Sequence, residues 1–129
     1  MPALLLALGA TGCEYSFDPI AAEATSFYPP SEYAQIWQDM VICTGFDFTR
    51  VSYQDVKWYR TSDECVYNPD HRTNDGCAAG LAWVEDNIIV LPDRSINDVM
   101  VVRHEIIHLL SGQRHHLGNY WDCVYWEAP

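Results

Sequence analysis

Residues 95–112 read SINDVMVVRHEIIHLLSG, and this stretch decides the fold of the chain. Apolar side chains recur through it at helical spacing: Val99, Val102, Ile106 and Leu109 or Leu110. Ser95, with Asp98 three residues later, resembles a capping signal, and Gly112 is well placed as a left-handed stop. We therefore expect a helix from about residue 95 to about residue 111.

The segments before this helix predict strands. The runs 81–84 (LAWV) and 88–91 (IIVL) indicate two strands joined by a turn at residues 85–87. Strand formers also recur between residues 46 and 60, and residues 61–80 are expected to form a polar loop.

A second helix is expected upstream, over about residues 31–42, and the whole pattern gives a fold class. Ile36, Met40 and Cys43 share one face of this helix, Ser31 is a good N-cap, and Gly45 ends it. The order helix, strands, helix predicts a small α+β domain with an N-terminal helix, a small and mostly antiparallel sheet, and a C-terminal helix.

The composition restricts the class of protein. The chain has 129 residues, 18 acidic and 7 basic side chains, and a net charge of −11. This length favours one domain, expected to be a monomer, and 49% apolar residues argue against disorder. The acidic balance argues against nucleic acid and anionic membrane surfaces as partners. No apolar run reaches the roughly 18–20 residues that span a bilayer.

The N-terminus resembles the end of a bacterial lipoprotein signal, in which small residues precede a cysteine that receives lipid. Residues 1–12 are the expected leader, Cys13 the lipidated residue, and 13–30 an extended tether before a domain at 31–129. Two departures stand out: no Lys or Arg precedes the apolar run, and Ala10 stands where Leu is usual. The alternatives are an ordinary secretory signal, a short buried segment, or a true start upstream.

Five cysteines support export. If Cys13 carries lipid, four remain, an even number that suits an exported domain with disulfides. Cys65 and Cys77 flank a turn-rich loop, which favours a local bridge, and Cys43 would then pair with Cys123. Four cysteines allow three pairings, so the other two stay open. Metal binding by these cysteines is the weaker alternative, because no C-x-x-C spacing occurs.

The C-terminal helix carries the pattern H-E-x-x-H, as His104, Glu105 and His108. Two residues four apart on a helix lie about 6 Å apart along its axis and on one face, so both imidazoles can bind one Zn²⁺. Glu105 lies off the metal but near a water that zinc would acidify, and it can act as a general base. The alternative is a pair of surface histidines.

A catalytic zinc usually takes three protein ligands, so a third is needed. His115 is preferred, because the turn at Ser111-Gly112 lets the chain double back. Its neighbour His116 and the more distant Glu127 are the alternatives, although Glu127 lies two residues from the chain end, where fraying is common.

The run VVRHEIIH resembles the metal helix of the zincin metallopeptidases, and the chain more closely resembles small bacterial lipoprotein-like zincins. The matching segments span about residues 32–123: Trp37 with Cys43, residues 77–83 (CAAGLAW), Ile88 to Leu91, His104 to His108, and His115, Tyr120 and Cys123. His116 stands where the group has Pro, and an extra residue precedes Gly80. The chain differs from the metzincins, because His115 is one residue too far from His108 for their H-x-x-G-x-x-H spacing and no methionine follows position 100.

This resemblance implies a zinc metallopeptidase at the bacterial cell envelope, anchored through Cys13 or else periplasmic or secreted, that hydrolyses peptides or proteins. It also implies that the strand 88–91 pairs with substrate; the simpler alternative is that this segment is only a core strand. From the residues themselves, Asp98, Asn119 and Asp122 are candidates to orient a ligand imidazole, although a solvated surface position is the favoured alternative for each. Tyr120 and Arg114 are candidates to stabilise an oxyanion, and a packing role is the equal alternative for Tyr120. We expect six aromatic residues to fill the core: Trp58, Tyr59, Trp83, Trp121, Tyr125 and Trp126. The rival function is an inactive metal-binding or interaction lipoprotein.

Overall fold

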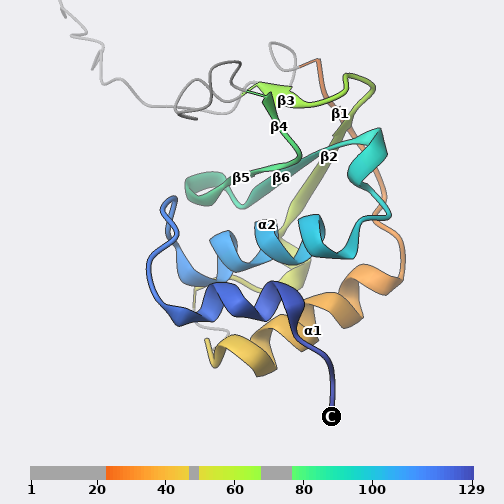
Figure 1. The fold of residues 1–129 in the computed structure, drawn as a ribbon. Helices are drawn as coiled ribbons and strands as arrows, with labels where there is room; N and C mark the ends of the chain where they lie inside the picture. The colour runs from red at the N-terminus through yellow and green to blue at the C-terminus, as the bar shows by residue number, and fades with distance from the viewer. Residues whose placement is uncertain (1–22, 47–49, 68–76) are drawn as a thin grey trace, which may run out of the picture.

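The computed structural model describes residues 23–46, 50–67 and 77–129, and its elements form three layers (Figure 1). A four-stranded sheet lies over helix α2 (Val99–Ser111), and helix α1 (Glu32–Thr44) lies with the C-terminal tail on the other side of α2. The expected α+β class, with its two helices, is confirmed. The leader, Cys13 and the loop 68–76 lie outside the described residues.

Helix α2 occupies the centre because most of its surface is apolar. Ile106, Ile107 and Leu109 are fully buried, as a helix with apolar residues on several faces requires. It starts at Val99, four residues later than Ser95. Asp98 is the actual N-cap, since its carboxylate accepts hydrogen bonds from the main-chain N–H groups of Met100 and Val101. Gly112, in the left-handed conformation, ends the helix as expected.

The sheet has the order β1 (Thr25–Ser26), β2 (Lys57–Thr61), β6 (Ile88–Pro92) and β5 (Leu81–Trp83). Strand β6 is buried throughout and pairs with β2 in parallel and with β5 antiparallel, which explains its uninterrupted apolar run. Strand β5 is the last strand at this side of the sheet, and it also contacts α2. Strand β1, antiparallel to β2, belongs to the segment expected to be a tether, so residues 25–26 pack on the domain.

The region 46–80 is more broken than the sequence predicts. A short 3-10 helix, Tyr53–Asp55, precedes β2, because Ser52 and Asp55 form a capping box that turns the chain. Inside the expected polar loop, β3 (Val66–Tyr67) pairs antiparallel with β4 (Cys77–Ala78).

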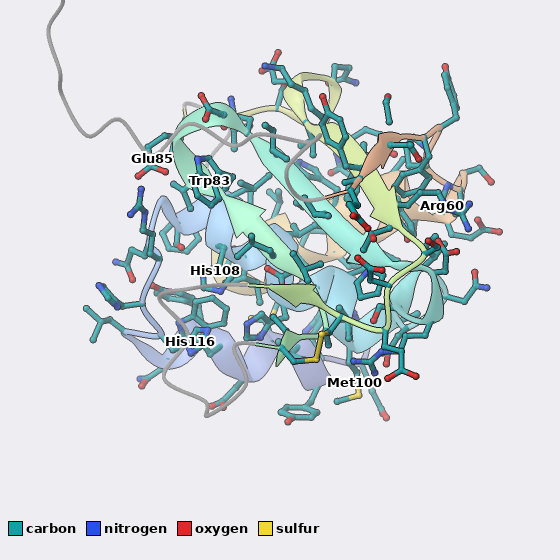
Figure 2. All side chains as sticks on the ribbon, turned by 90° about the horizontal axis from the view of Figure 1, so that it is seen from above. Arg60, Trp83, Glu85, Met100, His108 and His116 are labelled. Carbon is teal, nitrogen blue, oxygen red and sulfur yellow. A yellow bond between two sulfur atoms is a disulfide. The ribbon has the colours of Figure 1, made fainter. Side chains whose placement is uncertain are left out.

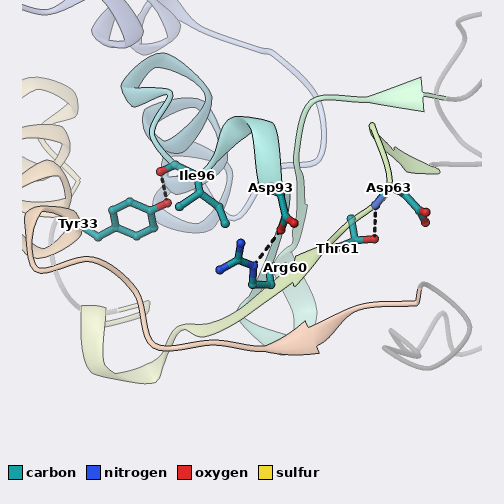
Figure 3. Close-up of polar contacts among 6 residues, drawn as sticks. All are labelled: Tyr33, Arg60, Thr61, Asp63, Asp93 and Ile96. Atoms are coloured by element: carbon teal, nitrogen blue, oxygen red, sulfur yellow. Dashed lines mark hydrogen bonds and ion pairs between the residues drawn. The ribbon is translucent and has the colours of Figure 1, made fainter.

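Helix α1 packs on α2, and it buries four residues at helical spacing in the core: Tyr33, Ile36, Trp37 and Met40. Ser31 precedes it, but with helical backbone angles and without a side-chain hydrogen bond, so it does not cap the helix in the usual way. The Tyr33 hydroxyl donates to the Ile96 carbonyl at 2.5 Å, just before α2 (Figure 3). An ion pair of 2.8 Å between Arg60 and Asp93 holds the same connection to β2 (Figure 3).

Two disulfides close the domain, with the pairing that the sequence favours. Cys43–Cys123 joins the end of α1 to the tail, and Cys65–Cys77 joins the two sides of the β3–β4 hairpin. Disulfides are typical of proteins in oxidising compartments outside the cytosol. Among the helices of the described residues, none has the length and apolar content to cross a membrane.

Candidate metal centre

Helix α2 places two imidazoles side by side. His104 and His108 are one turn apart, their ring centroids are 5.0 Å apart, and His108 is buried while His104 is half-buried. The buried apolar face of α2 fixes the rotation of the helix, so both rings point to the side where the tail passes. The helical spacing read from the sequence is therefore sufficient to bring this pair together.

The third ring comes from His116. Its Nε2 lies 3.1 Å from Nε2 of His104 and 3.2 Å from Nε2 of His108, and possible ligand atoms of the three residues all lie within 4.8 Å of one another. Bonds of about 2.0–2.1 Å from zinc to imidazole nitrogens set the ligands of a tetrahedral site about 3.3 Å apart. The two separations involving His116 match this spacing, so the three residues could hold a metal ion.

The structure brings His116 into this group and leaves out His115, the residue preferred from the sequence. His115 is exposed and lines the cleft beside the cluster, and Glu127 is exposed in the tail. The turn at Gly112 does let the chain double back, as expected. Spacing along the chain does not show which of two adjacent residues faces the helix, because that depends on the path of the returning segment.

The orientation of His108 is fixed by a main-chain carbonyl. Its Nδ1 lies 2.7 Å from the carbonyl oxygen of Gln113, which can only accept, so Nδ1 carries the proton and Nε2 keeps its lone pair. The candidates for this role in the sequence are Asp98, Asn119 and Asp122. Asp98 instead caps α2, while Asn119 and Asp122 are exposed. A main-chain acceptor leaves no signal in residue type, so the sequence alone does not reveal it.

Burial keeps the helix histidines neutral. Desolvation, followed by the neighbouring histidines, lowers the pKa of His104 to about 4. Desolvation likewise lowers the pKa of His108 to about 4, against the Gln113 hydrogen bond, which raises it. Both side chains are thus uncharged at neutral pH, the form in which imidazole binds a metal.

Glu105 lies beneath strand β5, with only 5% of its surface exposed. A β-carbon added to Gly80 would stand 3.0 Å from both Cγ and Oε1 of Glu105, so the glycine allows this close approach. Burial raises the pKa of Glu105 to about 8, although a hydrogen bond from the main-chain N–H of Ala82 lowers it. Because this N–H serves Glu105, it points away from β6 to the open edge of the sheet.

Trp121 forms a wall against the three imidazoles. Its ring centroid is 5.0 Å from that of His104, 4.6 Å from His108 and 4.4 Å from His116. It belongs to a 3-10 helix, Asn119–Tyr125, that packs on α2. The sequence suggested a core role for this tryptophan among several aromatic residues, and nothing in the pattern distinguished it. Tyr125, from the same set, is 71% exposed.

A cleft of about 820 Å³ opens on the cluster. Its lining includes the three histidines, Glu105, strand β5 and the exposed His115, but Trp121 is not part of it. The indole and the cleft therefore flank the cluster on different sides. Figure 2 shows His108 and His116 close together, with Trp83 and Glu85 to one side of them and Met100 to the other.

The oxyanion candidates have different surroundings. Arg114 lines the cleft but pairs with Glu85 at 2.5 Å. Tyr120 donates its hydroxyl to the side-chain oxygen of Gln113 and is outside the cleft lining. The strand expected to receive substrate, 88–91, is also unsuited, because β6 is paired on both sides. Within the described residues, β5 pairs with β6 alone, so its other edge is open.

Comparison of the chain with protein-family models, with curated proteins and with solved structures finds no match. The geometry of the site therefore carries the functional argument.

Proposed function

We propose that the chain is a zinc-dependent peptidase, with His104, His108 and His116 as metal ligands and Glu105 as general base. One observation carries this proposal: three imidazole groups converge near the buried carboxyl group of Glu105, and the same cleft reaches all four side chains. The assignment of His116 in place of His115 rests on the two Nε2 distances of 3.1 and 3.2 Å.

Each residue then has a defined task. The three histidines hold the ion, and Gln113 keeps Nε2 of His108 directed at it. Bound zinc would supply Lewis acidity that polarises a peptide carbonyl and acidifies a water. Glu105 accepts a proton from the attacking water as its oxygen joins the carbonyl carbon, and delivers that proton to the amine as the C–N bond breaks.

At neutral pH, Glu105 can act as a base only when the metal ion is bound close to it. Without a nearby cation its pKa of about 8 keeps it mostly protonated. A divalent charge close by favours the carboxylate and lowers this pKa. Base catalysis and metal binding would thus be coupled in one site.

The substrate would be a peptide or protein in an extended conformation along β5. This edge strand, Leu81–Trp83, lines the cleft directly beside Glu105. An extended chain can pair with an open edge through main-chain hydrogen bonds. The acidic net charge of −11 does not favour nucleic acid.

We further propose that the protein acts as a monomer at the bacterial cell envelope, anchored by lipid on Cys13. The two disulfides support an exported location.

The test uses purified protein with one equivalent of zinc and a mixed peptide library. We expect cleavage that a chelator abolishes and added zinc restores. Glu105→Gln should keep the metal and lose about 10²–10⁴-fold in rate, the usual contribution of a general base. Equal hydrolysis by wild type and Glu105→Gln would show that Glu105 is not the general base. Cleavage that is insensitive to chelator would show that hydrolysis does not need the metal.

The rival proposal is an inactive lipoprotein that binds metal or a partner. In the metal-free chain the raised pKa of Glu105 keeps its carboxyl protonated and unable to act as a base, which favours the form of this alternative that binds a partner without a metal. Stoichiometric zinc binding without cleavage of any peptide in the library would support this alternative.

A further inference from the structure

The third histidine reaches the cluster on a segment that needs its own support. Residues 112–118 connect α2 to the 3-10 helix 119–125 and form no helix or strand. His116 is exposed, so burial does not hold its ring as it holds His108. Backbone entropy opposes one fixed position for such a segment. Specific contacts must therefore place His116 near the other two rings.

Gln113 and Tyr120 supply those contacts at the two ends of the segment. The Tyr120 hydroxyl donates to Oε1 of Gln113, which closes residues 113–120 into a loop. The Gln113 N–H is in turn held by the Ser111 hydroxyl at 3.2 Å, and the Gln113 carbonyl accepts from His108. Gln113 thus contacts both the helix half of the site and the returning half.

Aromatic packing fixes Tyr120 itself. Phe46 meets the Tyr120 ring edge-on at 5.0 Å, and the Tyr120 ring lies 5.6 Å from that of Trp121, which contacts all three imidazoles. Gly118, with φ +96°, allows the ring to lie close, because a β-carbon there would stand 2.7 Å from a Tyr120 ring carbon.

We propose that Tyr120 and Gln113 are positioning residues, which hold His116 at the cluster before the metal binds. Because their hydrogen bond joins the two ends of the loop, loss of either partner lets the segment sample more positions. The ion must then order the segment on binding, which weakens its affinity. This proposal rests on the metal site of the proposed function and not on peptidase activity.

The test is a double-mutant cycle on zinc affinity, measured on the full chain by competition with a chromophoric chelator. Tyr120→Phe removes only the hydroxyl, and Gln113→Leu removes the side-chain acceptor while keeping the carbonyl that serves His108. Each should weaken zinc binding roughly 10-fold, in the range found for outer-shell partners. The double variant should lose about the same 10-fold and not 100-fold, because both changes break one bond.

Two further variants and one control measurement sharpen the result. Gln113→Glu keeps an acceptor for Tyr120 and should bind zinc no more weakly than wild type. Tyr125→Phe removes an exposed hydroxyl from the same 3-10 helix and should change nothing. Thermal unfolding in chelator shows whether each variant folds.

Several results would overturn the proposal. A zinc Kd within twofold of wild type in Tyr120→Phe excludes the positioning role. A lower unfolding temperature with an unchanged Kd assigns the hydroxyl to structure alone, and additive losses exclude a shared bond. Equal weakening by Tyr125→Phe shows a nonspecific effect. A wild-type chain that binds no zinc overturns the proposed function as well, whereas zinc binding without peptide cleavage leaves this inference standing.

Discussion

The two halves of the candidate metal site are held by different physics. His104 and His108 stand on a helix whose apolar residues are packed between the sheet and α1. His116 stands in an irregular segment, and the contacts that hold it include the Tyr120–Gln113 hydrogen bond, the Trp121 ring and the Cys43–Cys123 disulfide. The helix half depends on the core of the domain. The tail half depends on a small number of individual interactions, so its geometry should respond to single substitutions.

The largest expected effect separates the two adjacent tail histidines. His116→Ala removes a proposed ligand and should weaken zinc binding by more than the roughly 10–100-fold that an outer-shell change costs. His115→Ala, one residue away and exposed in the cleft, should leave the affinity near that of wild type. Equilibrium competition with a chelator measures both. The reverse ranking would return the ligand role to His115.

Next in size is the loss of the bond between α1 and the tail. Cys43→Ser combined with Cys123→Ser opens a loop with a sequence separation of 80 residues, and should lower the free energy of unfolding by about 2–4 kcal/mol. Zinc affinity should fall too, since the tail carries His116 and Trp121. The matched pair Cys65→Ser and Cys77→Ser opens a separation of only 12 residues, so its loss of stability should be smaller. Equal zinc affinity with and without the Cys43–Cys123 bond would show that the tail is positioned without it.

A smaller effect is expected at the helix half. Gly80→Ala forces a β-carbon against Glu105 and Val101, at 3.0 and 3.1 Å. Overpacking of this kind typically costs about 1–3 kcal/mol. We expect reduced hydrolysis with zinc stoichiometry unchanged, because Glu105 moves while the histidines stay. Chemical denaturation and peptide cleavage measure the two parts, and Ala79→Ser nearby is the control. Full activity in Gly80→Ala would show that Glu105 tolerates displacement.

The last prediction concerns the stability of the metal-free domain against pH. Glu105 has its pKa raised from 4.5 to about 8, so the folded state keeps a proton that the unfolded state releases, and stability falls as pH rises from 4.5 to 8. His104 and His108 have pKa values lowered from 6.5 to about 4, so they oppose this trend: their contribution is complete above 6.5 and is lost as pH falls toward 4.

These opposing shifts give a measurable signature. In chelator, the melting temperature of wild type should decline between pH 6.5 and 8, where the histidine contribution is constant. Glu105→Gln, which has no proton to lose, should show a flatter profile over the same range. Parallel profiles for the two proteins would show that the Glu105 carboxyl is not buried in its acid form. Acid below pH 6.5 should destabilise both.

Local patterns in the sequence determined the two helices, the strand pair before α2, the H-E-x-x-H pair and the favoured disulfide pairing. Helical spacing and turn residues act over a few neighbours, so they can be read from residue order. The start of α2 shifted because Asp98, not Ser95, satisfies the free N–H groups of the first turn.

Tertiary structure alone decided which tail histidine joins the cluster, which carbonyl orients His108, and that Trp121 and Gly80 border the site. These relations depend on how a returning segment packs against a helix far from it in the sequence. Adjacent residues such as His115 and His116 have the same side chain and almost the same spacing, so only the path of the backbone separates them. That path is set by long-range contacts, which include the Cys43–Cys123 disulfide and the aromatic packing of the tail. The free energies of such contacts cannot be read from a local sequence pattern.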